Sequence, residues 1–166
     1  LASSAASDVY KRQLVSCAED RSISQLRYQG YVRSLADHGL PLEQELVIEA
    51  GSFDIRQAYL AVRRRLMEGA RFTALFAISD NMAIGAMRAL REAGQQIPRD
   101  CSVIAIDGLT MSEYINPTLT TLCQPMEHMG RRSVEILLDM VEHRGGPIRE
   151  TAHTTLRTGE SVRDIS

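Results

Sequence analysis

Short apolar runs alternate with segments of helical periodicity along most of this chain. The runs at Leu14–Cys17, Leu46–Ala50, Ala74–Ile78 and Ser102–Ile106 predict strands, because each is short, largely apolar and followed by polar or turn residues. Amphipathic segments separate them and predict helices. This alternation indicates an α/β fold, an open parallel sheet with helices on both faces and a ligand at its carboxyl edge.

The predicted helices begin near Ser22, Asp54, Met82 and Pro125. Ser22 with Gln25, and Asp54 with Gln57, match helix-capping pairs. The residues Gly145-Gly146-Pro147 are predicted to end the last helix. Short strands are predicted at Thr118–Leu122 and Thr151–Leu156. One face of the first helix carries Ile23, Leu26, Gly30, Tyr31, Ser34 and Leu35, and the stripe of the last carries Met126, Met129, Ser133, Ile136, Leu137, Met140 and Val141.

Composition narrows the function classes. A length of 166 residues favours one domain, and the net charge of -2 provides no electrostatic footprint for nucleic acid. The triplet Arg63–Arg65 is typical of a solvated helix face, with a nucleic-acid patch as the alternative. No apolar run of about 18 residues occurs, so no membrane span is predicted. The cysteines Cys17, Cys101 and Cys123 are far apart and favour reduced thiols in a cytoplasmic protein.

Six candidate site residues follow the carboxyl ends of predicted strands, which meet at one edge of a parallel sheet. They are Arg27, Phe53, Ser79, Asp80, Asp107 and Gln124. Carboxylates accept hydrogen bonds from hydroxyls, arginine donates two parallel bonds, and an aromatic ring covers a sugar face. The set therefore predicts a polyhydroxylated small-molecule ligand.

Several of these residues have structural alternatives. Ser79 or Asp80 can cap the following helix. Phe53 lies in a turn and either folds into the core or faces the ligand. Asp107 is harder to explain structurally, because no helix pattern begins after it.

Catalytic motifs are missing from the chain. There is no G-x-S-x-G elbow, no G-x-G-x-x-G or Walker loop, and no metal-ligand spacing among His38, His128, His143 and His153. A phosphoacceptor domain would need a lysine late in the chain, and Lys11 is the only lysine. The sequence therefore predicts no catalytic residue, no metal and no cofactor.

A longer pattern resembles the effector-binding domain of lactose/galactose-repressor (LacI) family transcription regulators. It runs through Phe72–Ala86, Ser102–Asp107 and Pro117–Thr121 to Gln124 and Met129-Gly130. The resemblance covers roughly Leu14 to Thr158. It implies a two-lobed, periplasmic-binding-protein type I fold, and effector contacts at the positions of Arg27, Phe53, Ser79, Asp107 and Gln124.

Departures from the family pattern shape the expected domain organisation. The family usually has asparagine where Ser79 stands, and Asp107-Gly108 also occurs in secreted sugar-binding proteins of the fold. A helix-turn-helix and most of the first lobe are missing, so residues 14–158 are expected to be a partial effector domain, mainly the second lobe. Only Pro125–Arg144 resembles first-lobe sequence. Residues 159–166 are assigned to a polar tail, and residues 1–13 are either non-native or a disordered linker.

The leading hypothesis is the effector-sensing portion of a cytoplasmic regulator without catalysis. The resemblance implies a homodimer that binds operator DNA through an N-terminal domain outside this chain, with a sugar or related polyol as effector. The alternatives are a periplasmic sugar-binding protein of an uptake system and, from the enzyme class, a hydrolase or transferase using Asp80 or Asp107.

Overall fold

The computed structural model describes residues 12–16, 22–142, 144 and 148–163. Within them a six-stranded sheet has the order β2-β1-β3-β4-β5-β6. Strands β1 to β5 pair in parallel, whereas β6 pairs with β5 antiparallel. The bounds are β1 Arg12–Ser16, β2 Val47–Glu49, β3 Ala74–Ala77, β4 Ser102–Asp107, β5 Thr120–Cys123 and β6 Thr155–Arg157. The predicted α/β class is confirmed, with β6 as the one departure from parallel pairing.

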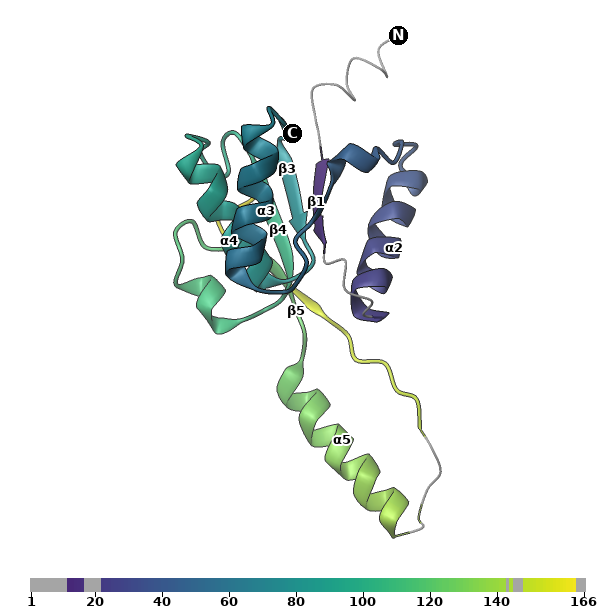
Figure 1. Ribbon diagram of the computed structural model, residues 1–166. Coiled ribbons are helices and arrows are strands. Elements are labelled where there is room, and N and C mark those ends of the chain that lie inside the picture. The colour runs from purple at the N-terminus through teal and green to yellow at the C-terminus, as the bar shows by residue number, and fades with distance from the viewer. Residues whose placement is uncertain (1–11, 17–21, 143, 145–147, 164–166) are drawn as a thin grey trace.

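Helices lie on both faces of this sheet (Figure 1). Helices α3 (Ile55–Met67) and α4 (Asp80–Glu92) cover one face, and α2 (Ser22–Asp37) lies on the other. Two short 3-10 turns, η1 (Gln44–Leu46) and η2 (Thr110–Glu113), connect the elements. The cap predicted at Asp54 is confirmed, since its side chain accepts from the backbone N–H groups of Arg56 and Gln57 at the start of α3.

The core lies between the sheet and the pair α3–α4. The predicted inner face of α4 is confirmed: Met82, Ala83, Ala86, Met87 and Leu90 are all buried. Gly85 faces α3 so closely that a Cβ on it would lie 2.1 Å from the carbonyl oxygen of Ile55. A glycine is therefore required where these two helices meet.

The face predicted for α2 is partly wrong. Ile23 and Leu26 are 54% and 66% exposed, whereas Tyr31 and Leu35 of the same predicted face pack on the core as expected, together with Tyr28. Periodicity identified the helix but not its rotation about its own axis, because polar Ser24, rather than Ile23, lies buried in its first turn.

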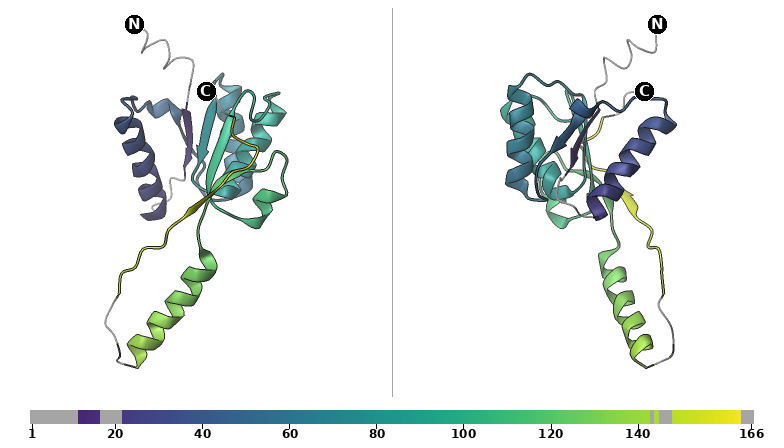
Figure 2. Two further views of the ribbon diagram at one scale, coloured as in Figure 1. Left: turned by 180° about the vertical axis from the view of Figure 1, so that it is seen from behind. Right: turned by 45° about the vertical axis from the view of Figure 1, so that its right-hand side comes forward.

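Helix α5 (Met126–Val141) forms as predicted but has no buried residue. It projects from the sheet in all three views (Figures 1 and 2), and Leu137 and Val141 are 59% and 65% exposed. Its amphipathic stripe therefore has no partner among the described residues. Its assignment to the first lobe stays a prediction from the sequence.

Residues 159–163 are joined to the sheet. Ser161 is fully buried, and its hydroxyl donates to the carbonyl oxygen of Val103 at 2.6 Å and accepts from the N–H of Thr120 at 2.9 Å. The described part of the predicted tail, residues 159–163, is thus anchored. Residues 1–11, Cys17, His143, the helix stop at 145–147 and residues 164–166 lie outside the described residues.

Candidate functional site

Three of the predicted site residues meet at the carboxyl edge of the sheet. The Asp107 carboxylate oxygen Oδ1 accepts from Arg27 Nη2 at 3.1 Å and from Gln124 Nε2 at 2.8 Å. Arg27 also donates through Nη1 to the carbonyl oxygen of Ile78, at the end of β3. A cation, a carboxylate and an amide are therefore held together by direct hydrogen bonds.

Strand register explains why these residues meet. Asp107 is the last residue of β4 and pairs with Cys123 of β5, so Gln124 begins the chain beyond that edge. The Gln124 N–H donates to the Asp107 carbonyl oxygen at 3.1 Å. Arg27 lies in the N-terminal half of α2, which follows β1, so its side chain reaches the same edge.

Asp107 has an unusual backbone. Its φ of 146° lies in a region that residues other than glycine rarely adopt. Such backbone strain costs about 1–3 kcal/mol. Gly108 follows with a φ of 79°, and a Cβ there would lie 2.6 Å from Cys123. Strain of this kind is concentrated at functional sites, so the backbone and the hydrogen bonds both point to Asp107.

The pKa of the Asp107 carboxyl group is raised above its ordinary value. Desolvation by burial raises the pKa of its carboxyl, while the Arg27 charge and hydrogen bond lower it without cancelling the rise. The ionised form is therefore less favourable here than in water, although it has a cation as neighbour.

Replacing Asp107 by asparagine is expected to raise the free energy of unfolding at neutral pH, by about 0.5–1 kcal/mol. The amide is neutral and keeps an oxygen that can accept from Arg27 and Gln124. Because the native pKa lies above the ordinary value, the wild type gains stability as the pH falls through that pKa, and the variant's advantage shrinks. Urea unfolding at neutral pH and near about pH 4 measures both effects.

Asp100→Asn is the matched control, because Arg99 holds the pKa of Asp100 below its usual range. It is expected to lose stability at neutral pH. A less stable Asp107→Asn variant at neutral pH would contradict the assigned direction for Asp107.

Ser79 and Asp80 have structural roles here. The Ser79 hydroxyl caps α4 by accepting from the Met82 N–H at 3.2 Å, and the residue is 3% exposed. Asp80 is fully buried; its Oδ1 accepts from the Thr121 hydroxyl at 2.5 Å and its Oδ2 from the Leu109 N–H at 2.7 Å. The capping alternative holds for Ser79, whereas Asp80 joins α4 to β5 and to the chain after Asp107.

Phe53 lies in the turn before α3, as predicted. It is partly buried and packs against the hydrophobic core. This packing fits the core alternative for the ring, and a contact between Phe53 and the effector stays a prediction.

Sequence reasoning missed two residues near the site. Arg157 donates to the carbonyl oxygen of Leu109, in the chain after Asp107. Ser112 is fully buried beside it. Ser112 follows no predicted strand, so the sequence carried no signal for it. Arg157 comes directly after the predicted strand Thr151–Leu156, a signal that the prediction from sequence did not use.

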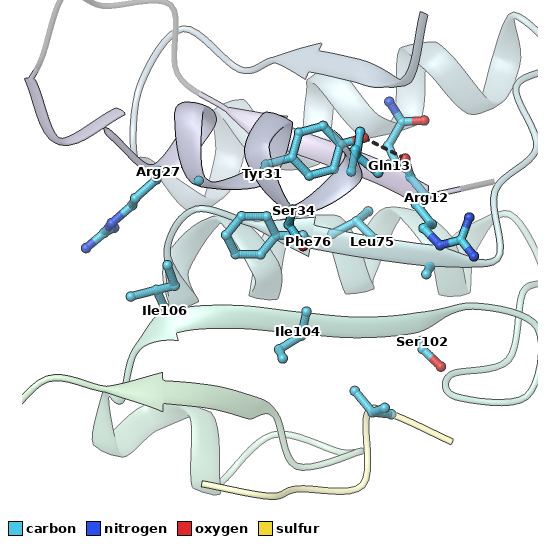
Figure 3. A pocket seen from close by; sticks show the side chains of 14 residues that line it. Arg12, Gln13, Arg27, Tyr31, Ser34, Leu75, Phe76, Ser102, Ile104 and Ile106 are labelled. Atoms are coloured by element: carbon cyan, nitrogen blue, oxygen red, sulfur yellow. Dashed lines mark hydrogen bonds between the residues drawn. The ribbon is translucent and has the colours of Figure 1, made fainter. Parts of the chain in front are cut away.

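A separate groove of about 530 Å³ lies between α2 and the sheet. Figure 3 shows Phe76, Ile104 and Ile106 along it, with Arg27 at one end. Asp107 and Gln124 do not line it, and most of its side chains are apolar. It therefore suits apolar contacts and differs from the polar cluster predicted for a hydroxylated ligand.

The described residues contain no group of three or more His, Cys, Asp or Glu side chains placed to hold a metal ion. None of the helices within the same residues has both the length and the apolar character needed to cross a membrane.

A doubly wound α/β lobe with a polar cluster at its carboxyl edge has the arrangement of a ligand-binding domain, because ligands bind at that edge of open parallel sheets. Comparison with known families agrees: the model described as "periplasmic binding protein-like domain" matches residues 11–162, and the chain belongs to that family. The resemblance to LacI-family effector-binding regions is confirmed by the relatives that the chain matches.

Curated relatives are named as transcription regulators. The HTH-type transcriptional regulator MalR of Clostridium butyricum is 36% identical over 145 residues, which are 87% of this chain and 42% of that protein. The repressor PurR of Vibrio cholerae is 36% identical over 147 residues, which are 88% of this chain and 44% of that protein. The chain thus spans less than half the length of these relatives.

Solved structures show the same fold. A structure titled as a transcriptional regulator CelR–cellobiose complex superposes with a TM-score of 0.85 at 31% identity, over 91% of this chain and 46% of that one. A LacI-family sugar-binding regulator from Escherichia coli, complexed with phosphate, gives 0.82 at 29% identity, over 96% and 59%.

Proposed function

We propose that this chain is the effector-binding portion of a DNA-binding transcriptional regulator, and that its effector is a sugar or a related polyol. The observation that carries the proposal is the cluster in which Arg27 and Gln124 both bind Asp107 at the carboxyl edge of the sheet. The regulator names of the relatives support the biological role.

The chemistry of the cluster suits vicinal hydroxyls. Both side-chain bonds to Asp107 end on Oδ1, so Oδ2 is the oxygen we assign to a ligand hydroxyl. A guanidinium presents several donors in one plane, and Arg27 uses two nitrogens for Ile78 and Asp107. The Gln124 amide offers an oxygen that accepts while its nitrogen donates to Asp107. Acceptors and donors thus alternate over a short distance, as adjacent hydroxyl groups require.

The proposal extends to the parent protein. We propose a cytoplasmic homodimer that binds operator DNA through a domain outside this chain and has no catalytic activity. An effector that binds one conformation better would shift the equilibrium between operator-binding and non-binding states. The periplasmic uptake alternative has less support, because the relatives named above are transcription regulators.

Sugar binding by this chain is expected to be weak, with a roughly millimolar Kd, because one lobe alone buries only part of a ligand. Titration of ¹⁵N-labelled chain with cellobiose, ribose and glucose is expected to shift the NMR signals of Arg27, Asp107 and Gln124. The same titration on Asp107→Asn should lose these shifts, whereas Glu113→Gln, a surface change, should keep them.

Two outcomes would count against the proposal. Sugars that shift no signal at the three residues would contradict a hydroxylated effector at this site. A micromolar affinity by calorimetry would contradict the expectation that the chain holds only part of the cleft.

The DNA upstream of the Leu14 codon separates the two biological roles: a helix-turn-helix in frame supports the regulator, and a signal peptide supports the uptake protein.

A further inference from the structure

The backbone of Leu109, two residues beyond Asp107, is held from both sides. Its N–H donates to Asp80 Oδ2 at 2.7 Å. Its carbonyl oxygen accepts from the Ser112 hydroxyl at 2.6 Å, from the Ser112 N–H at 3.1 Å and from Arg157 Nη2 at 3.0 Å. One peptide segment therefore connects a buried carboxylate and a guanidinium.

These contacts lie mostly out of water. Asp80 and Ser112 are fully buried, and the Arg157 side chain is 27% exposed. Arg157 Nη2 also donates to the Ser112 hydroxyl, while Nη1 pairs with Glu113 at the surface. Hydrogen bonds to charged groups are stronger than neutral ones, and more so in a region of low dielectric. The bonds from Arg157 Nη2 to Leu109 and Ser112 should therefore be stronger than the exposed bond from Nη1 to Glu113.

The partners of Leu109 come from different elements. Asp80 begins α4, whereas Arg157 ends β6, where it pairs with Thr121 of β5. Strand β6 is the one by which the chain returns to the sheet after the projecting helix α5 (Figure 1). Arg157 is thus a direct link between the chain that returns from α5 and the loop that follows the candidate site.

Asp107 needs such support. Its positive φ is an unfavourable conformation, and residues persist in it only where the surrounding structure holds them. On the strand side, the Asp107 carbonyl oxygen accepts from the Gln124 N–H. On the loop side, Gly108 leads directly to the Leu109 peptide. When the Leu109 peptide is fixed, the orientation of the Asp107 side chain at the end of β4 is fixed as well.

We infer that Arg157 is a positioning residue for the Asp107 carboxylate and couples it to strand β6. The inference rests on the proposed function in so far as Asp107 contacts the effector. It follows that a displacement of β6 together with α5 would change the geometry of Asp107. A ligand bound to Asp107 would in turn change the position of β6. This coupling is reciprocal by thermodynamic necessity.

Hydrogen exchange measured by NMR tests the inference without a ligand. In Arg157→Met, exchange of the Gln124 amide, which is bonded to the Asp107 carbonyl, is expected to quicken about tenfold. The Leu109 amide should quicken as well, while amides of α3 and the inner face of α4 keep their rates. In Arg157→Lys, where one donor remains, the Gln124 rate is expected to lie between those of the wild type and Arg157→Met.

Glu113→Gln is the matched control, because it removes the charge of the surface partner of Nη1 and leaves the bonds to Leu109 and Ser112. Its Gln124 rate should equal that of the wild type. If Arg157→Met does not fold, the comparison of Arg157→Lys with Glu113→Gln remains decisive. Faster exchange confined to residues 109–113 and β6, with Gln124 unchanged, would overturn the positioning role. Since no sugar is involved, this result is independent of whether the proposed function holds.

Discussion

Alanine at position 80 is expected to lower the free energy of unfolding by about 3–4 kcal/mol. Asp80 is fully buried, and its two oxygens accept from the Thr121 hydroxyl and the Leu109 N–H. Removing the carboxylate leaves both donors buried without an acceptor, and each such donor costs about 1–3 kcal/mol. The first turn of α4 also loses a negative charge that its helix dipole favours.

Urea unfolding at neutral pH measures this loss as a change in midpoint with the slope preserved. Asp54→Ala is the matched control: Asp54 also stands at the start of a helix, but its contacts are exposed. That variant should lose only about 1 kcal/mol, the usual value of an N-cap. Equal losses for the two variants would show that the buried bonds of Asp80 contribute nothing beyond a cap.

Gly85→Ala is expected to destabilise the protein by about 3 kcal/mol, although alanine is the better helix former by about 1 kcal/mol. A Cβ at this position would lie 2.1 Å from the Ile55 carbonyl oxygen and 2.9 Å from the Tyr59 nitrogen. Both atoms belong to the backbone of α3, so no side chain can move aside. The two helices would have to separate, and the core beneath them, including Val62 and Met82, would open.

Gly30→Ala provides a control of opposite sign. Gly30 lies within α2, and a Cβ there would meet nothing within 4 Å. Its substitution should stabilise the protein by about 0.5–1 kcal/mol through helix propensity alone. Both variants can be compared by urea unfolding. A Gly85→Ala variant as stable as the wild type would mean that the contact between α3 and α4 is looser than the structure shows.

The strands and helices were largely predictable because their signals are local. Asp54 and Ser79 begin helices through hydrogen bonds to N–H groups two or three residues away. The buried face of α4 repeats with the period of a helix, and that period is visible in the sequence. The prediction was weaker for α2 and α5, since a stripe of apolar residues shows that a helix forms but not what covers it.

The candidate site was predictable only in part. Arg27, Asp107 and Gln124 were found because parallel strands bring their carboxyl ends to one edge, which is a rule of the fold rather than of any residue. The same rule selected Ser79 and Asp80, whose side chains the structure uses for a cap and a buried link. Residues after the same kind of strand thus differ in role according to the direction in which each side chain points.

Local sequence patterns established the order of the helices and strands, the α/β class and the edge of the sheet where polar groups collect. Periodicity, capping residues and turn residues act over a few positions, so they can be recognised along the chain. The contacts among Asp80, Leu109 and Arg157, and the unpartnered face of α5, were decided by the three-dimensional arrangement. They join residues up to 48 positions apart, through hydrogen bonds whose existence depends on strand register and helix rotation.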